Sequence, residues 1–257
     1  MLRVPGTGLV LSTGEAVGYG VGALFVGWWL FSETPARGLT YDAAMRIVDH
    51  AHATGAVHVL GHGPGRMLKI SPRVNGAKLG YRTNFGDGPS ASRDEVIDPR
   101  LLVLLLRMTE QFPDIVSIDH AGIYPSGHTA AADETHNRGT SIDFSRFVMS
   151  NGAAYDVLRD WGSKPKNGPG MRLPIGSANR VFFDRMYEFL AGQATDMPTD
   201  GCGFSGSNHF ATSTIGDKSF LITPDHGSGS LAAMHRDHIH AQVGPTRNCA
   251  GKNAAVW

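Results

Sequence analysis

The sequence predicts a mixed α+β protein, and three observations support this fold class. Residues 140–147 and 238–243 alternate polar and apolar side chains, the period-two pattern of half-buried strands. Residues 41–54 and 98–112 carry the start and stop signals of helices. The chain also holds 33 glycines and 14 prolines, which indicate many turns and long loops.

The helices are predicted from their ends. Thr40 is a good N-cap for the helix over 41–54, and a glycine follows its last residue. Asp98, followed by a proline, caps the helix that ends at residue 112, and the continuous apolar run of that helix predicts deep burial. Two more helices are expected over 152–161 and 178–190.

The other strands are predicted from composition and turns. Residues 67–74 and 77–84 are expected to be strands that meet at Asn75-Gly76, a favourable hairpin turn. A further strand is expected over 114–124. Loops are expected over 61–65, 125–135 and 200–230, the last of these lying over the functional site.

Composition and charge restrict the function. Lysine plus arginine and aspartate plus glutamate both number 23, so no global field favours nucleic acid or an anionic membrane as a partner. The only cysteines, Cys202 and Cys249, bracket the second histidine cluster. A disulfide between them and two unrelated small apolar residues are equally open interpretations.

The N-terminal segment contains an uncharged stretch over residues 16–32. It is short for a membrane span, it is broken by small and polar residues, and Arg3 alone supplies a basic charge before it. We therefore expect no stable membrane span and no convincing signal peptide, but a buried helix or hairpin. A signal peptide or anchor, and an insertion or docking element, are the alternatives.

Three residues in the two alternating segments predict a metal site. On a strand, Asp143 shares a face with Ser141 and Ser145, and His240 shares one with His238, whereas residues two apart on a helix would diverge. A turn at Gly139 brings His136 back beside Asp143. Two imidazoles and a carboxylate, His136, Asp143 and His240, suit zinc (Zn2+) with a fourth position open for water.

These motifs, His136-Asn-Arg-Gly-Thr-Ser-Ile-Asp143 and His235-Arg-Asp-His-Ile-His240, resemble those of the D-Ala-D-Ala metallopeptidase and Hedgehog superfamily of zinc peptidases. Within it they are most similar to the penicillin-insensitive murein endopeptidases, which end in HxxHxH. Glu134 stands where that signature has serine, and Ser141 where it has alanine.

The resemblance implies a central antiparallel sheet with flanking helices and long loops. It covers residues 115–147 and 233–244 and is absent before about residue 95, so we expect a zinc peptidase domain over 95–257 and an N-terminal extension or subdomain over 1–94. It also implies that His136, Asp143 and His240 bind the metal. Cobalt and manganese are alternative ions for these ligands.

Two histidines are the expected catalytic residues. His238 lies two residues from a ligand on the same strand face and is the best general base, since the chain has no HExxH motif. His235 is expected to orient substrate or to donate a hydrogen bond to the developing oxyanion. Asp237 is expected to cap or form a salt bridge, and Glu134 is the alternative acid–base group.

The implied substrate is an amide bond in a peptide stem or cross-link of peptidoglycan. Carboxypeptidases of the superfamily commonly carry arginine after tyrosine before the zinc motif, but Pro125 follows Tyr124 here. This favours an endopeptidase, although Arg82 and Arg138 are candidates to replace that arginine. A zinc D,D-carboxypeptidase and a Hedgehog-like binding module without turnover remain alternatives, as does a metal-dependent hydrolase of another amide or ester.

A cell-wall substrate without an export signal requires a delivery route to the periplasm or cell wall. An antibacterial effector carried by secretion machinery, with an immunity protein in its producer, is one hypothesis, and a phage lysin released at lysis is another. The remaining histidines are expected in ordinary roles, with a second metal or substrate contact as the alternatives: His50, His52, His58, His62, His120, His128, His209 and His226.

Overall fold

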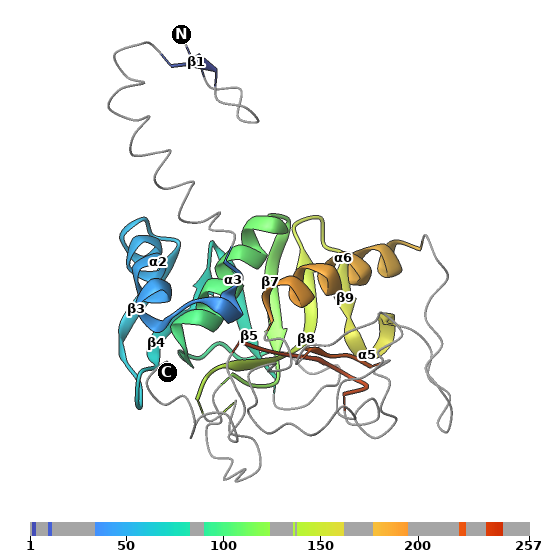
Figure 1. Cartoon of the computed structure of the whole chain (residues 1–257). Helices are drawn as coiled ribbons and strands as arrows, with labels where there is room; N and C mark the ends of the chain where they lie inside the picture. The colour runs from blue at the N-terminus through green and yellow to red at the C-terminus, as the bar shows by residue number, and fades with distance from the viewer. Residues whose placement is uncertain are drawn as a thin grey trace. The chain divides into compact units, whose positions relative to one another are not determined.

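A computed structural model of the chain (Figure 1) describes residues 2–3, 10–11, 34–82, 90–123, 136, 138–161, 177–194, 221–224 and 235–243. The chain forms two units, residues 1–34 and 35–257. In the first, strands β1 (Leu2–Arg3) and β2 (Val10–Leu11) pair antiparallel. The stretch over 16–32 lies outside the described residues. Among the helices of the described ranges, none has the length and apolar character needed to cross a membrane.

The second unit confirms the mixed α+β class and is built on a nine-stranded sheet. The strand order is β10-β11-β8-β7-β5-β4-β3, with β6 paired to β4 and β9 paired to β8. All pairs are antiparallel except β5 with β7. The strands are β3 (Val57–His62), β4 (Leu68–Val74), β5 (Ala77–Tyr81), β6 (Glu95–Ile97), β7 (Ile115–His120), β8 (Ser141–Met149), β9 (Ala154–Asp156), β10 (Leu221–Ile222) and β11 (Ile239–Gln242).

The two helices predicted from Thr40 and Asp98 form where these caps indicate. The Thr40 hydroxyl accepts from the N–H of Ala43 and begins α2 (Tyr41–Ala53), after the short 3₁₀ helix η1 (Ala36–Gly38). The Asp98 carboxylate accepts from the N–H of Arg100 and begins α3 (Pro99–Gln111). Its leucines are fully buried, as the apolar run predicts. The last long helix is α6 (Ala178–Gln193), which confirms the expectation over 178–190.

The predicted hairpin is confirmed. Asn75 and Gly76 have φ values of 47° and 81°, the left-handed conformations that a tight two-residue turn between strands requires. The turn joins β4 to β5. The second strand is shorter than expected, because β5 ends at Tyr81.

Three segments differ from the predictions. A single helix over 152–161 is wrong: Tyr155 pairs with Phe147 in the strand β9, and only α5 (Val157–Asp160) is helical. The change occurs at Asp156, whose carboxylate accepts from the N–H groups of Leu158 and Arg159 and so caps α5. The expected loop at 61–65 begins inside a strand, since β3 runs to His62, and the expected loop at 200–230 contains β10.

The two faces of β8 carry different chemistry. Phe144 and Phe147 contact each other with ring centroids 5.6 Å apart, and Phe147 contacts Phe182 of α6 at 5.5 Å. This apolar face therefore packs against α6, which crosses β7, β8 and β9 in Figure 1. The residues that precede the two phenylalanines, Asp143 and Arg146, turn to the opposite face.

A bulge changes the predicted pattern of that opposite face. The register between β7 and β8 shifts so that His120 pairs with Phe144 and Asp119 with Arg146, which leaves Ser145 as the extra residue. Ser145 is buried, and its hydroxyl donates to the carbonyl of Asp119. The expectation that Ser145 shares a face with Asp143 is therefore wrong, and Arg146 takes that place.

The sheet joins the two sides of the expected boundary between residues 94 and 95. Strand β5 pairs with β7 over Lys78–Tyr81 and Ser117–His120, and β6 connects β4 to the start of α3. The division between the two compact units of the chain lies instead between residues 34 and 35. Residues 35–94 thus contribute to the same sheet as the predicted metal ligands.

Candidate metal centre

The pairing of β8 with β11 brings two of the predicted ligands together. Asp143 and His240 are directly opposite each other in this antiparallel pair. Side chains at opposed positions of a sheet lie on the same face, about 5 Å apart at Cβ. Both polar side chains alternate along their strands with buried core residues: Ile142, Phe144 and Ile239. Asp143 and His240 therefore point to the face of the sheet opposite these core residues. The strand pattern and this pairing together therefore bring two of the three predicted ligands to one place.

The third ligand arrives from the turn before β8. Gly139 has a φ of +64°, and its N–H donates to the carbonyl of His136 at 2.9 Å, closing the turn that the sequence predicts. On its other side, the Nδ1 of His136 lies 3.2 Å from the carbonyl oxygen of Ile123, just beyond β7. The His136 ring is thus held between the turn and the end of a neighbouring strand.

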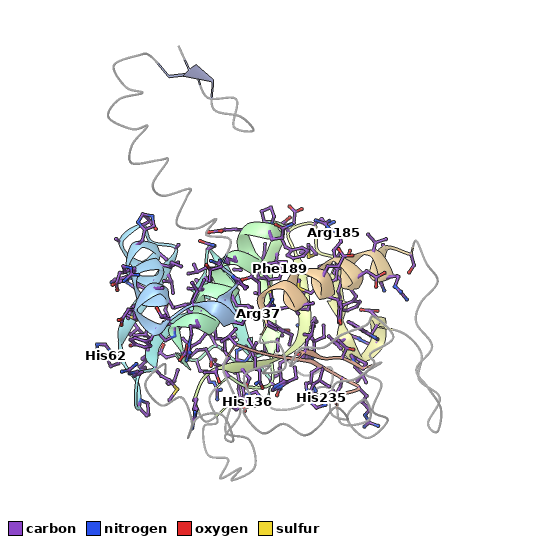
Figure 2. All side chains as sticks on the ribbon, in the orientation of Figure 1. Arg37, His62, His136, Arg185, Phe189 and His235 are labelled. Atoms are coloured by element: carbon purple, nitrogen blue, oxygen red, sulfur yellow. The ribbon has the colours of Figure 1, made fainter. Side chains whose placement is uncertain are left out.

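The three predicted ligands converge. One ligand atom from each of His136, Asp143 and His240 lies within 4.8 Å of the other two, so the group could hold a metal ion. The Nε2 of His136 is 3.3 Å from Asp143 Oδ2, and the Nδ1 of His240 is 2.8 Å from Asp143 Oδ1. Figure 2 labels His136 in the lower part of the view, well apart from Arg185 and Phe189 of α6 in its upper part.

The partners of the two rings are compatible with a metal ion between the three residues. The second nitrogen of each ring faces an oxygen: Nδ1 of His136 faces the Ile123 carbonyl, and Nε2 of His240 faces Gln242 Oε1 at 3.5 Å. A neutral imidazole that donates its N–H to this oxygen presents a lone pair to the carboxylate of Asp143. In this tautomer the three groups can share a metal ion, whereas without a metal the ring N–H groups donate to the carboxylate instead, at 3.3 Å from His136 and 2.8 Å from His240. The donor set therefore fits a metal ion.

Without a metal, the histidine rings themselves keep Asp143 ionised. Burial alone raises the pKa of the carboxyl, but the charge and hydrogen bond of His136, the hydrogen bond of His240 and the charge of His238 outweigh it. The net result is a pKa well below the ordinary value. Asp143 is therefore an anionic, deprotonated ligand over the whole physiological pH range.

The predicted catalytic histidines lie beside this group. His238 is buried, and its Nε2 lies 3.7 Å from Asp143 Oδ1. The ring of His235 is 4.7 Å from that of His238 and 5.7 Å from that of His240, and Figure 2 labels His235 on the same side as His136. All five predicted site residues therefore gather in one place.

The structure describes three of the residues that the sequence offered as alternative substrate-binding or site residues. Arg82 is fully buried and pairs with Asp156, so its guanidinium is occupied inside the protein. Arg138, at the turn that carries His136, is only partly buried. His120 is fully buried beside Glu95 and away from solvent.

No second metal cluster forms in the described part of the chain: His50, His52, His58 and His62 do not gather into a three-ligand group. The rings of His52 and His58 are 5.6 Å apart, but the Nδ1 of His52 lies against the backbone at Val57. Other residues named from the sequence lie outside the described ranges: Tyr124, Pro125, His128, Glu134, Cys202, His209, His226 and Cys249.

Sequence reasoning missed three contributors to the site. These are the Ile123 carbonyl, the Gln242 amide and the Asp237 carboxylate, which lies 2.7 Å from Nδ1 of His238. The period-two pattern places Gln242 on the same strand face as His240, so the contribution of Gln242 could have been predicted from the sequence. The other two depend on how the chain turns outside the strands.

No family model, no curated protein and no solved structure matches this chain.

Proposed function

We propose that this protein is a zinc-dependent peptidoglycan endopeptidase that hydrolyses an amide bond in peptide stems or cross-links. The observation that carries the proposal is the convergence of His136, Asp143 and His240 around one position, with Nε2 of His238 3.7 Å from Asp143. A metal with three protein ligands and a neighbouring base is the arrangement of hydrolytic zinc sites.

Zinc is the ion that these donors suit best. Two imidazole nitrogens and one carboxylate oxygen form a ligand set of the kind found in zinc hydrolases. A single carboxylate leaves the bound dication with net positive charge. When bound, zinc lowers the pKa of water towards neutrality and polarises the carbonyl that is attacked. The Ile123 carbonyl and Gln242 orient the two imidazoles for this task.

The remaining groups act on substrate and protons. His238 faces the metal position through Nε2 and is placed to take a proton from the attacking water. His235, next to it, is placed to orient the substrate or to donate to the oxygen that becomes negative. A base beside the ligands favours a hydrolase over a Hedgehog-like binding module, which needs no such group.

The endopeptidase is favoured over a D,D-carboxypeptidase by the position of Arg82. A carboxypeptidase needs a cation for the terminal carboxylate of its substrate. Arg82 is buried against Asp156 and does not offer one. Arg138 remains the candidate for this role, so product analysis decides between the two reactions.

Digestion of purified sacculi by the zinc-loaded protein tests the proposal. We expect muropeptide dimers to fall to monomers, measured by mass spectrometry of the products. Loss of a single terminal D-alanine instead would identify a carboxypeptidase. Unchanged muropeptides would refute the peptidoglycan hydrolase and leave the binding module or a hydrolase of another amide or ester.

Two variants separate metal binding from proton transfer. His240→Ala is expected to remove zinc and activity together, because it deletes a ligand. His238→Ala is expected to keep zinc and lose about 10²–10⁴-fold in kcat, the usual contribution of a general base. If His238→Ala kept full turnover, His238 would not be the general base, and Glu134 would be the next candidate for that role.

The proposed site of action is the periplasm or cell wall, reached by a secretion system or by phage lysis. An antibacterial effector would require an immunity protein in its producer. Expression in the cytoplasm of a Gram-negative host, and in its periplasm with an added signal, tests this. Killing only from the periplasm is expected, and equal tolerance in both compartments would contradict a wall-directed toxin.

A further inference from the structure

A short contact orients the proposed base. Asp237 Oδ1 lies 2.7 Å from Nδ1 of His238, and the two side chains are 18% and 9% exposed. This is the length of a charge-assisted hydrogen bond. Asp237 makes no other hydrogen bond or ion pair in the described part of the chain. The sequence predicts a cap or a salt bridge for Asp237, and the contact with His238 is such an ion pair whenever the ring is protonated.

The contact fixes which nitrogen of His238 carries the proton. An ionised carboxylate only accepts hydrogen bonds, so the neutral ring must donate its N–H from Nδ1. The lone pair is then on Nε2, the nitrogen that faces Asp143 Oδ1 at 3.7 Å. The opposite tautomer would set a lone pair against the carboxylate of Asp237. The arrangement thus aims a basic nitrogen at the metal position.

The neighbouring chain keeps this geometry in place. Residues 235–237 form a turn that leads directly into β11, so Asp237 and His238 are fixed relative to the ligand His240. The ring of His238 is buried, and it lies against the ring of His235 with centroids 4.7 Å apart. Rotation of the His238 ring would therefore lose both the packing and the hydrogen bond.

We propose that Asp237 is a positioning residue that holds His238 as the Nδ1–H tautomer, with Nε2 directed to the metal site. The consequence for catalysis rests on the proposed function, whereas the assignment of the His238 tautomer rests only on its contact with Asp237. Asp237 touches neither the metal position nor, by this proposal, the substrate. Its effect passes entirely through the ring of His238.

Nuclear magnetic resonance tests the tautomer without any substrate. Long-range proton–nitrogen spectra of the zinc-loaded protein, labelled with ¹⁵N-histidine and recorded at about pH 8, distinguish the two ring nitrogens. We expect the proton on Nδ1 of His238 in the wild type and in Asp237→Glu. In Asp237→Asn the amide donates to Nδ1 instead, which moves the ring proton to Nε2. A wild-type ring with its proton on Nε2 would overturn the proposal.

Kinetics on muropeptide dimers test the consequence. We expect Asp237→Asn to lower kcat on the order of 10²–10⁴-fold, as wrong orientation of a catalytic imidazole does in other hydrolases. KM and zinc affinity should remain as in the wild type, and Asp237→Glu should restore part of kcat. Asp94→Asn is the matched control, since Asp94 is an exposed carboxylate paired with Lys69.

The outcomes are separable. A kcat of Asp237→Asn within twofold of the wild type would overturn the positioning role and leave the peptidase intact. A wild type that cuts no muropeptide would refute the proposed function, and the spectra would still decide the tautomer. A loss of zinc in Asp237→Asn would show a structural role and would also contradict the proposal.

Discussion

Asp98 holds the turn that carries the predicted ligand His136: its backbone N–H donates a 2.9 Å hydrogen bond to the carbonyl of Gly139. The residue that caps α3 is therefore also in contact with the turn between His136 and β8. This one backbone hydrogen bond joins the start of α3 to the turn that carries the predicted ligand His136. Changes at this contact should affect stability and metal binding together.

Gly139→Ala should lower both the stability of the protein and its affinity for zinc. A Cβ at this position would lie 2.8 Å from the sulfur of Met67 and 3.0 Å from the nitrogen of Asp98, and the φ of +64° is itself unfavourable for alanine. The left-handed conformation alone costs about 1–2 kcal/mol. We expect a greater loss in the free energy of unfolding, measured with urea, and weaker zinc binding.

Gly152→Ala is the control for that change. Gly152 also has a left-handed φ, +84°, but nothing lies within 4 Å of the added Cβ. It should lose only the backbone term of about 1–2 kcal/mol and keep zinc affinity. Equal effects of the two substitutions would show that the contact with Met67 and Asp98 does not matter.

Asp143→Asn should abolish tight metal binding, because the amide carries no charge and is a weak zinc ligand. Changes to groups that merely support zinc ligands cost about 10–100-fold in affinity, so loss of a ligand should cost at least 10²-fold, as an order of magnitude. Competition with a chromophoric chelator measures it. His62→Ala, an exposed histidine on β3, should bind zinc as the wild type does, and equal affinity in all three proteins would rule out this site.

The metal-free protein should lose stability in acid through Asp143. The folded-state pKa of this carboxyl is well below its ordinary value, so its contribution is present above the unfolded-state pKa, about 3.9, and is lost as pH falls through the folded-state pKa. Urea unfolding should show the advantage of wild type over Asp143→Asn shrinking as pH decreases from about 5 to 3. A constant difference over this interval would contradict the depressed pKa.

Phe182→Ala should destabilise the apolar side of the sheet. Phe182 is 8% exposed, stacks on Tyr155 with ring centroids 4.0 Å apart and contacts Phe147 of β8, the strand that carries Asp143. Removal of a buried phenylalanine costs about 3–5 kcal/mol. Thermal unfolding measures the loss, and Val181→Ala, whose side chain is 48% exposed, should change stability by less than about 0.5 kcal/mol. A small effect of both would mean that α6 contributes little to the core.

The elements that the sequence predicted well are those decided by neighbouring residues. Thr40 and Asp98 cap helices through atoms two or three residues away, and Asn75-Gly76 adopts the left-handed turn that joins β4 to β5. The strand β3 was missed because its residues lack strict alternation and its pairing with β4 contains two register shifts. Such a strand is stabilised by its partner rather than by its own pattern.

The sequence by itself predicted the three residues that converge: period-two alternation put Asp143 and His240 on strand faces, and a glycine marked the turn that returns His136. It could not determine which strand pairs with which, the bulge that replaced Ser145 by Arg146, or the contact of Asp237 with His238. Only the tertiary structure decided these: the first two depend on contacts and register shifts between strands distant in sequence, and the third depends on how the chain turns just before β11. Local periodicity contains no information about them.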